Sequence, residues 1–236
     1  MARGSFLDPA LADADGLVGV GLGLTTERLL EAYRRGIFPF YDDTTPVLWW
    51  SPDPRAVFEL DGMHVSRRLA RTVRSGKFTP TVDRCFRRII EGCADRGPGR
   101  GCWLLPEMIE AYTRLHELGH AHSLEVWHDG ALAGGVYGVA VGGLFAAESM
   151  FTRMRDGSKV ALAFLIEHLR ARGFELCDIQ MSTPHTLSLG AVEIARSEYL
   201  RRLRKALRRE AVFDPKESAS SAAGDAGRGA DRPGDP

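Results

Sequence analysis

The apolar segment 144–151 constrains the fold of this chain most strongly, because it carries a single carboxylate, Glu148, between hydrophobic residues. A second apolar run, 174–180, carries Asp178 and Gln180, which strand alternation places on one face. Polar side chains in strands this apolar cost free energy unless they find partners, and functional sites are where proteins tolerate that cost. We interpret the three side chains as candidate catalytic groups, with satisfied core or edge residues as the alternative.

The order of elements around these runs predicts an α+β fold. Alternating strands joined by tight turns form an antiparallel meander, and a helix, a further strand and more helix follow it. The strands are expected at 122–128, 131–139, 144–151 and 174–180, and Ser158 is expected to cap a helix over 159–172. Two earlier helices are expected, one capped by Thr25 or Thr26 and ending at Gly36, and one over 106–118.

Composition also divides the chain into parts. Aromatic and proline residues crowd positions 36–55, which favours a small-domain core over a regular helix, and a short strand at 56–60 precedes a boundary near Gly62. Large apolar residues almost cease after Phe213, so the acidic segment that follows is expected to be disordered. The predicted organisation is a small N-terminal α/β domain at 1–62, a catalytic domain at 63–213 and a disordered tail at 214–236.

Charge and hydropathy limit the class of protein. The 236 residues carry no net charge, so an anionic partner has to meet a local basic patch. The N-terminus has no apolar signal region, and the longest uncharged stretch, 131–147, holds five glycines and is shorter than the roughly 20 residues of a membrane span. The four cysteines lack zinc spacing, and we expect them to be reduced thiols of a cytoplasmic protein.

Two basic clusters are candidate contacts for an anionic partner. The first lies at 64–88, where Arg67, Arg71 and Arg74 share one helical face, and the second decorates a helix expected from Ser197 onward. Dense clusters in a neutral chain fit a phosphate backbone. For either cluster alone, a solvated helix face is the alternative.

The run from His116 to His120 matches the H-E-x-x-H zinc pattern. Zinc chemistry of this kind requires both histidines on one helical turn. Gly119 stands where the helical periodicity stops and His122 enters a strand, so His120 is expected to point away from His116. We therefore expect no metal site and interpret these histidines as a helix-to-strand corner.

The meander and the helix after it resemble the core of GNAT (acyl-CoA N-acyltransferase-like) enzymes. In those enzymes a glycine-rich loop before this helix presents backbone N–H groups to the pyrophosphate of coenzyme A. The corresponding loop here has one glycine and places Asp156 at the helix entrance, where a carboxylate repels a pyrophosphate. The resemblance therefore implies a GNAT-like C-terminal domain that uses a different acyl donor.

More specific motifs occur in both halves of the chain. They are YRRGIFP at 33–39, LWWSPDPR at 48–55, LHELGHAHS at 115–123, ESMF at 148–151 and SLGA at 188–191. In this order they are similar to motifs of the leucyl/phenylalanyl-tRNA–protein transferase family. The resemblance extends from about residue 16 to about residue 209.

The resemblance implies a cytosolic, cofactor-free enzyme, expected to be a monomer, that moves leucine or phenylalanine, and also methionine, from its tRNA to the N-terminal Arg or Lys of a protein. The new N-terminus marks that protein for degradation. By position, Asp178 and Gln180 form the catalytic pair, and Glu148 faces the reacting amine or the acceptor. The residues implied to hold the terminal adenosine are Phe40, Trp103 and Tyr112. Those implied to line the amino-acid side-chain pocket are Val136, Phe145, Met150, Leu162 and Leu165. Those implied to contact tRNA phosphates are Arg67, Arg68, Arg71, Arg74 and Arg84.

The chemistry that this reaction needs agrees with these residue types. An aminoacyl ester is already activated, so neither ATP nor a metal is required, but the attacking α-amine has a pKa of about 8 and needs a proton acceptor. As a hypothesis, Gln180 positions the amine, Asp178 polarises Gln180, and Glu148 pairs with a cationic acceptor. A coenzyme A-dependent GNAT N-acyltransferase and a non-enzymatic RNA-binding module remain as alternatives.

Overall fold

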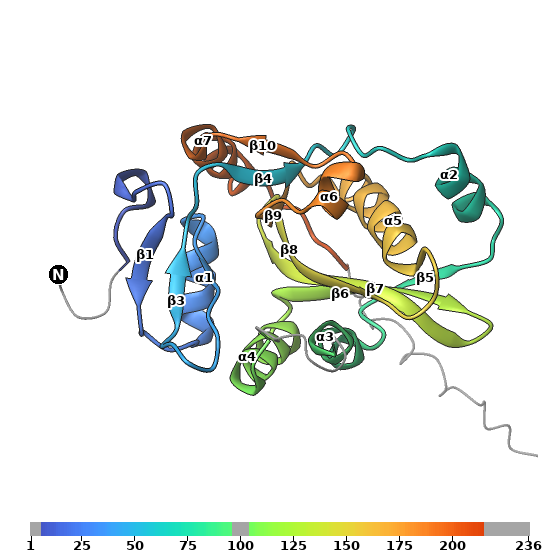
Figure 1. The fold of residues 1–236 in the computed structure, drawn as a ribbon, viewed down its shortest axis with the longest axis horizontal. Helices are drawn as coiled ribbons and strands as arrows, with labels where there is room; N and C mark the ends of the chain where they lie inside the picture. The colour runs from blue at the N-terminus through green and yellow to red at the C-terminus, as the bar shows by residue number, and fades with distance from the viewer. Residues whose placement is uncertain (1–5, 96–103, 215–236) are drawn as a thin grey trace, which may run out of the picture.

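The computed structural model describes residues 6–95 and 104–214. It contains two sheets that lie side by side along the long axis of the molecule (Figure 1). The smaller sheet has the order β1-β3-β2, with antiparallel pairing throughout, and α1 packs against it. The bounds here are η1 (Pro9–Leu11), β1 (Leu17–Val20), α1 (Thr26–Arg34), β2 (Phe38–Pro39) and β3 (Leu48–Trp50).

The larger sheet has the order β10-β4-β9-β8-β7-β6-β5. Its pairs are antiparallel except for β8 and β9, which run parallel because α5 connects them. The expected meander is therefore present as β6, β7 and β8, and the prediction of an α+β fold is confirmed. The strand bounds are β4 (Arg55–Phe58), β5 (Thr79–Val82), β6 (Ala121–His128), β7 (Ala131–Val141), β8 (Leu144–Thr152), β9 (Leu176–Gln180) and β10 (Val192–Ile194).

Helices cover both faces of the larger sheet, with α5 on one face and α3 and α4 on the other (Figure 1). The sheet is consequently buried on both sides, and separate apolar clusters fill the two layers. The remaining helix bounds are α2 (Arg67–Arg74), α3 (Phe86–Ala94), α4 (Pro106–Glu117), α5 (Gly157–Ala171), α6 (Pro184–Ser188) and α7 (Arg196–Ala206). None of the helices in the described parts of the chain is long and apolar enough to cross a membrane.

Strand β4 belongs to the larger sheet, although the predicted small domain 1–62 includes it. It pairs with β9 on one side and with β10 on the other. The chain therefore passes from the smaller sheet to the larger one between Trp50 and Arg55, some residues before the predicted boundary at Gly62. The predicted tail lies outside the described residues from position 215 onward.

The helix ends follow local chemistry, with one difference from expectation. The Thr25 hydroxyl accepts the N–H of Arg28 at 3.3 Å and caps α1, and Gly36 adopts a left-handed φ of +75° just after it, as predicted. Ser158 does not cap α5, because the helix begins at Gly157, two residues before the expected start. Asp156 is the N-cap residue instead, with a left-handed φ of +70°.

Regular strand geometry fails at two neighbouring points of the larger sheet. Between β7 and β8, Tyr137 pairs with Ser149 while Gly138 pairs with Ala147, so Glu148 is the extra residue of a β-bulge on β8. On β9, Gln180 has a left-handed φ of +60°, which is uncommon for a residue with a side chain. Backbone pairing between β8 and β9 extends only as far as Ala146 and Asp178, immediately before these two irregularities.

Candidate active site

Asp178 is held by a buried arginine from β4. The Arg55 Nε donates to Asp178 Oδ1 at 2.9 Å and Arg55 Nη2 donates to Oδ2 at 2.6 Å, and both side chains are about 1% exposed. The Tyr199 hydroxyl from α7 also donates to Oδ2, at 2.8 Å. A buried charge pair with this bidentate geometry is rigid, so Asp178 is a fixed anchor rather than a free base.

Arg55 is enclosed as tightly as its partner. Its third nitrogen donates to the carbonyl of Gly36 at 3.0 Å, and its guanidinium lies between the rings of Phe38 and Tyr199, 4.9 Å and 4.4 Å from their centroids. Both rings therefore add cation–π attraction to the ion pair. Arg55 thus ties the smaller sheet, through Gly36 and Phe38, to Asp178 in the larger one.

Gln180 links Asp178 to Glu148. Its backbone N–H donates to Asp178 Oδ1 at 2.9 Å, and its side-chain amide donates to Glu148 Oε1 at 3.0 Å. The three predicted groups therefore lie in one chain of hydrogen bonds. The hypothesis that Asp178 polarises the Gln180 amide has no support in the geometry, since Asp178 contacts the Gln180 backbone and not its side chain.

Glu148 is half-buried and receives a further hydrogen bond from Tyr112 of α4, which is bonded in turn to Tyr33 of α1. The Tyr112 hydroxyl donates to Glu148 Oε2 at 3.3 Å, and the hydroxyls of Tyr33 and Tyr112 lie 2.6 Å apart. Burial raises the pKa of Glu148 to about 8, and the nearby Asp178 adds to the rise, while the tyrosine hydroxyls and Arg55 oppose it. The group is thus a carboxyl that exchanges a proton near neutral pH.

The two tyrosines remain proton donors in this setting. Burial raises the pKa of the Tyr33 and Tyr112 hydroxyls well above the ordinary value of 10, and the charge of Glu148 raises both further. Tyr112 is fully buried, so its ring offers no open face against which an adenine could stack. Its described contact with the site is the hydroxyl on Glu148.

The other residues expected around the adenosine lie in different surroundings. Phe40 follows β2 and is 38% exposed, so its ring is accessible to a ligand. Trp103 lies outside the described residues. Phe40 also borders a cavity of about 450 Å³ that reaches Met181, the residue after Gln180.

The residues expected to line the amino-acid pocket lie mainly under α5. Val136, Phe145, Leu162 and Leu165 are at most 2% exposed and share one apolar cluster between the sheet and α5. This cluster occupies the face opposite to α4 and Tyr112. Met150 lies at the margin of the cluster and lines a separate cavity of about 640 Å³ beside α3.

The two basic clusters differ in how much of their charge is neutralised. Arg67, Arg71 and Arg74 project from α2 and are exposed, Arg68 pairs with Asp156 at 2.9 Å, and Arg84 stacks over Trp127. On and after α7, in contrast, most charges pair within the protein: Arg201 and Arg202 with Glu198, Arg202 with Glu59, and Lys205 and Arg209 with Glu175. The α2 cluster therefore keeps more charge available for an anionic partner.

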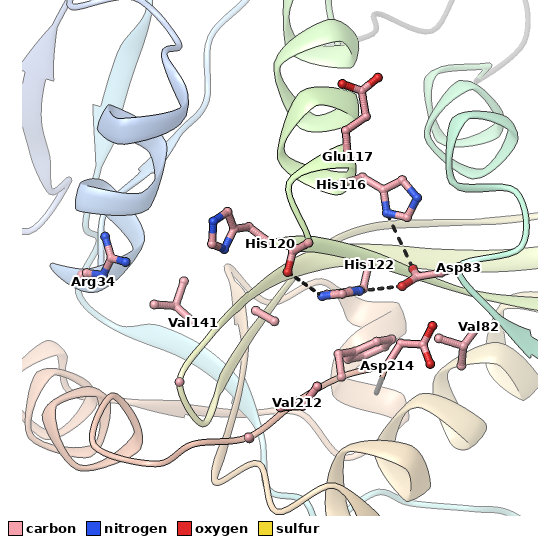
Figure 2. A pocket seen from close by; sticks show the side chains of 15 residues that line it. Arg34, Val82, Asp83, His116, Glu117, His120, His122, Val141, Val212 and Asp214 are labelled. Atoms are coloured by element: carbon pink, nitrogen blue, oxygen red, sulfur yellow. Dashed lines mark hydrogen bonds and ion pairs between the residues drawn. The ribbon is translucent and has the colours of Figure 1, made fainter. Parts of the chain in front are cut away.

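The histidines of the H-E-x-x-H run form a corner with diverging side chains. Figure 2 shows His116 directed toward Asp83 and His120 directed toward Arg34, on the two sides of a cavity of about 860 Å³. His116 Nδ1 meets the carbonyl of Ala121 at 2.8 Å, and His122 Nδ1 meets Asp83 Oδ2 at 2.6 Å. Within the described ranges, no three His, Cys, Asp or Glu side chains are grouped to hold a metal ion.

Sequence reasoning missed Arg55, Tyr33 and Tyr199, three residues that complete the site. The signal for Arg55 was present, because a carboxylate inside an apolar strand needs a cation, and Arg55 opens the apolar strand β4. No comparable signal marked the two tyrosines, since they read as apolar positions of helical faces. Their role follows only from the way α1 and α7 pack.

Comparisons with known proteins agree with the motifs. Residues 57–204 match the model of the family described as leucyl/phenylalanyl-tRNA protein transferase, and residues 23–53 match the N-terminal domain of the same family. A leucyl/phenylalanyl-tRNA–protein transferase from Solidesulfovibrio magneticus is 52% identical over 209 residues, which are 88% of this chain and 85% of that protein. One from an Anaeromyxobacter species is 53% identical over 207 residues, covering 87% and 88%.

The comparison with solved structures found proteins with other names, among them GCN5-related N-acetyltransferases. A GCN5-related N-acetyltransferase from Kribbella flavida has a TM-score of 0.40 and 13% identity, covering 69% of this chain and 58% of that one. A GCN5-related N-acetyltransferase from Sphaerobacter thermophilus has a TM-score of 0.38 and 16% identity, covering 79% and 60%.

Proposed function

This chain belongs to the leucyl/phenylalanyl-tRNA–protein transferase family, and from that premise we propose that it transfers leucine or phenylalanine from aminoacyl-tRNA to the N-terminal Arg or Lys of acceptor proteins. Methionine is a further donor residue in this proposal. The enzyme acts in the cytoplasm as a monomer, and the new bulky N-terminal residue marks the acceptor for degradation. The observation that carries the proposal is the contact of Glu148 with Gln180 where the pairing of β8 and β9 ends.

Glu148 is the proposed proton acceptor. An incoming α-ammonium has a pKa of about 8, which is close to the value of about 8 that burial gives Glu148. Proton transfer between groups of matched pKa costs little free energy, and an arriving cation further favours the ionised carboxylate. The Gln180 amide, fixed on the same carboxyl, is proposed to orient the amine.

The reaction balances with these groups alone. Ionised Glu148 takes one proton from the ammonium, and the free amine attacks the ester carbonyl carbon. The new C–N bond forms, the bond from the carbonyl carbon to the ribose oxygen breaks, and that oxygen leaves with the second amine proton. One proton is then released from Glu148 to solvent, and holding the amine and ester together supplies about 7–11 kcal/mol of the acceleration.

Asp178 and Arg55 are proposed as positioning residues. Asp178 fixes the backbone of Gln180, and Arg55 neutralises Asp178, so neither needs to touch the substrate. Because Arg55 comes from the predicted 1–62 domain and Gln180 from the predicted 63–213 domain, both parts are proposed to be required for activity. No cofactor takes part in this scheme.

The donor substrate is proposed to bind in two places, one for the amino-acid side chain and one for the tRNA. The apolar cluster under α5, with Met150 at its margin, is proposed to receive the amino-acid side chain through the end of the β8–β9 pairing. One methylene changes apolar binding by only about 1–3 kcal/mol, so tolerance of Leu, Phe and Met is expected. The residues in this role are Val136, Phe145, Met150, Leu162 and Leu165.

The tRNA is proposed to bind at two kinds of contact. Phe40, together with Trp103, stacks on the terminal adenosine, and Tyr112 contributes through its hydroxyl on Glu148. The exposed arginines hold the acceptor stem through its phosphates, which contribute affinity but little sequence reading. These arginines are Arg67, Arg68, Arg71, Arg74 and Arg84.

The coenzyme A alternative has an unfavourable feature at α5. The carboxylate of Asp156 stands at the N-terminus of that helix, where a pyrophosphate would accept hydrogen bonds from backbone N–H groups. Arg68 pairs with Asp156 and neutralises its charge but adds no net positive charge for a pyrophosphate. The test is transfer of labelled leucine from tRNA to an Arg-initiated peptide, with acetyl-coenzyme A and no tRNA in the parallel reaction. Acylation only in the second reaction would replace the proposal with the alternative.

Variants complete the test of the site. Gln180→Ala and Asp178→Ala are each expected to lower turnover by about 10²- to 10⁴-fold. Asp43→Asn, in an exposed turn of the smaller domain, serves as the matched control. Turnover near the wild-type value in both site variants would remove the catalytic assignment.

A further inference from the structure

The smaller sheet presents a row of aromatic side chains to a cavity next to the reaction centre. Leu17 and Phe38 pair with Trp50 from either side, so the three side chains lie at one level across the sheet. Together with Phe40 they line the cavity of about 450 Å³. Met181, the residue after Gln180 at the end of β9, also lines the cavity and connects it to the proposed reaction centre.

The two ends of this cavity differ in chemistry. Strands β1 and β2 both run antiparallel to β3, so they are parallel to each other, and Leu17 and Phe38 share a level. The carbonyls on either side of Asp15 accept the N–H groups of Ser51 and Asp53, whereas the N–H of Phe40 donates to the carbonyl of Leu48. Asp15 and Phe40 therefore lie on opposite sides of Trp50 along the chain of β3. Asp13 also lines the cavity, so its far end is acidic and its near end aromatic.

The acidic end is held in place, in part by Arg196, whose guanidinium donates to the carbonyls of Ala12 at 2.5 Å and of Asp13 at 2.8 Å. The carbonyl of Gly16 accepts the N–H of Ser51 at 2.7 Å, and the carbonyl of Ala14 accepts that of Asp53 at 3.2 Å, so the segment with Asp13 and Asp15 continues the sheet edge. Asp13 uses one oxygen to accept the N–H of Gly16 at 2.8 Å. Among the described residues, no Lys, Arg or His forms an ion pair with either carboxylate.

We propose that this cavity is the acceptor subsite, in which Asp13 and Asp15 bind the cationic side chain of the acceptor's N-terminal residue while its aliphatic stem lies against Trp50. The inference rests on the proposed function, because only that reaction brings a cationic N-terminus to the site. The aliphatic stem of Arg or Lys packs on apolar surface while its charged head reaches the carboxylates. The indole is fixed for this role, since its Nε1 donates to the carbonyl of Phe40 at 2.7 Å.

The negative charge at the far end of the cavity argues against tRNA as its ligand. The tRNA end carries phosphates, which the carboxylates of Asp13 and Asp15 repel. Phe40 lies on the other side of Trp50 from these two carboxylates and suits the adenosine. Two separate carboxylates also explain tolerance of both acceptors. A fixed fork of acceptors would favour the planar guanidinium of Arg, whereas separate charges serve the ammonium of Lys as well.

The test uses the full chain with saturating leucyl-tRNA and peptides that begin with Arg or with citrulline, its uncharged analogue. Asp13→Asn/Asp15→Asn is expected to raise KM for the Arg peptide roughly 3- to 30-fold, since it removes two solvent-exposed ion pairs. The preference for Arg over citrulline should fall by the same factor. Asp15→Lys should lower the preference further, and Asp43→Asn should leave it unchanged.

Three outcomes separate the possibilities. A wild-type Arg preference in both Asp15 variants would overturn the subsite. So would a raised KM for leucyl-tRNA with an unchanged KM for the Arg peptide, because the acidic end would then face the tRNA. If the wild-type chain transfers no leucine to any peptide, the proposed function itself fails, and this result is distinct from a loss of charge discrimination.

Discussion

Replacing Arg55 by methionine is the sharpest test of how the site is held together. The substitution removes the guanidinium and leaves the Asp178 carboxylate in a place that is about 1% exposed. Only the Tyr199 hydroxyl at 2.8 Å and the Gln180 N–H at 2.9 Å remain as described donors to it. Breaking a buried pair from one side costs about 3–5 kcal/mol, because the remaining charge is uncompensated.

The same structure predicts a different result when both partners are removed. Arg55→Met/Asp178→Leu removes both charges of this pair, and apolar replacement of a buried pair is neutral or stabilising by about 1–4 kcal/mol. Against this, the Gly36 carbonyl, the Tyr199 hydroxyl and the Gln180 N–H lose partners at about 1–3 kcal/mol each, and the Gly36 carbonyl loses its partner in Arg55→Met as well. The double variant is therefore expected to be more stable than Arg55→Met while lacking the positioned Gln180, and hence to be inactive.

Urea unfolding at pH 7, followed by far-UV circular dichroism, measures these free energies. At about 2–4 °C per kcal/mol for a chain of this size, Arg55→Met should also lower Tm by roughly 6–20 °C. Arg202→Met is the matched control, since it breaks half-exposed pairs with Glu59 and Glu198 and should cost at most about 1 kcal/mol. A cost below about 1 kcal/mol for Arg55→Met, or a double variant as unstable as the sum of the singles, would refute the reasoning.

Three shorter predictions concern pH, backbone strain and salt. Because burial raises the pKa of Glu148 from 4.5 to about 8, the folded state keeps a proton that the unfolded state releases between these values. The free energy of unfolding should therefore fall as pH rises through this window, by up to about 1.4 kcal/mol per pH unit, and Glu148→Gln should flatten the slope measured by urea unfolding at pH 5, 6.5 and 8. Equal slopes in both proteins would contradict this. Gln180→Gly should be more stable than Gln180→Ala by about 1 kcal/mol, the reverse of the usual order, because φ is +60° there; thermal unfolding measures the difference. Replacing Arg67, Arg71 and Arg74 by Gln should reduce the slope of log Kd for tRNA against log salt by about 2–3, measured by fluorescence anisotropy at 50–200 mM KCl, with Arg201→Gln as a paired-charge control; an unchanged slope would exclude these arginines as phosphate contacts.

Local signals in the sequence predicted most of the elements. Thr25 and Gly36 delimit α1 as expected, because a capping hydroxyl and a left-handed glycine act within a few residues. The predicted start of α5 was wrong by two residues, since Asp156 rather than Ser158 is the N-cap residue and takes a left-handed conformation.

Long-range pairing accounts for what the sequence could not predict. Arg55 and Asp178 are 123 positions apart, and nothing in the spacing of either residue selects the other. The membership of β4 in the larger sheet has the same cause, because its partners β9 and β10 lie more than a hundred residues later. Periodicity reports which face of an element is apolar, but it does not report which distant element covers that face.

Glu148 and Gln180 can contact a substrate because regular sheet geometry ends at their positions. Had β8 and β9 continued to pair beyond Ala146 and Asp178, the next backbone groups would have bonded to one another and closed the sheet. The bulge at Glu148 and the left-handed Gln180 interrupt both strands at the same level, so the two strands meet there through side chains, at 3.0 Å. Such an interruption leaves polar groups without backbone partners, which a protein tolerates only where the surroundings are rigid. The buried pair of Arg55 and Asp178 supplies that rigidity one step before the break, because it holds the Gln180 backbone by a direct hydrogen bond. The ion pair and the two strand irregularities therefore depend on each other. Removing the ion pair is expected to loosen the irregular strands, and restoring regular strands is expected to disturb the ion pair.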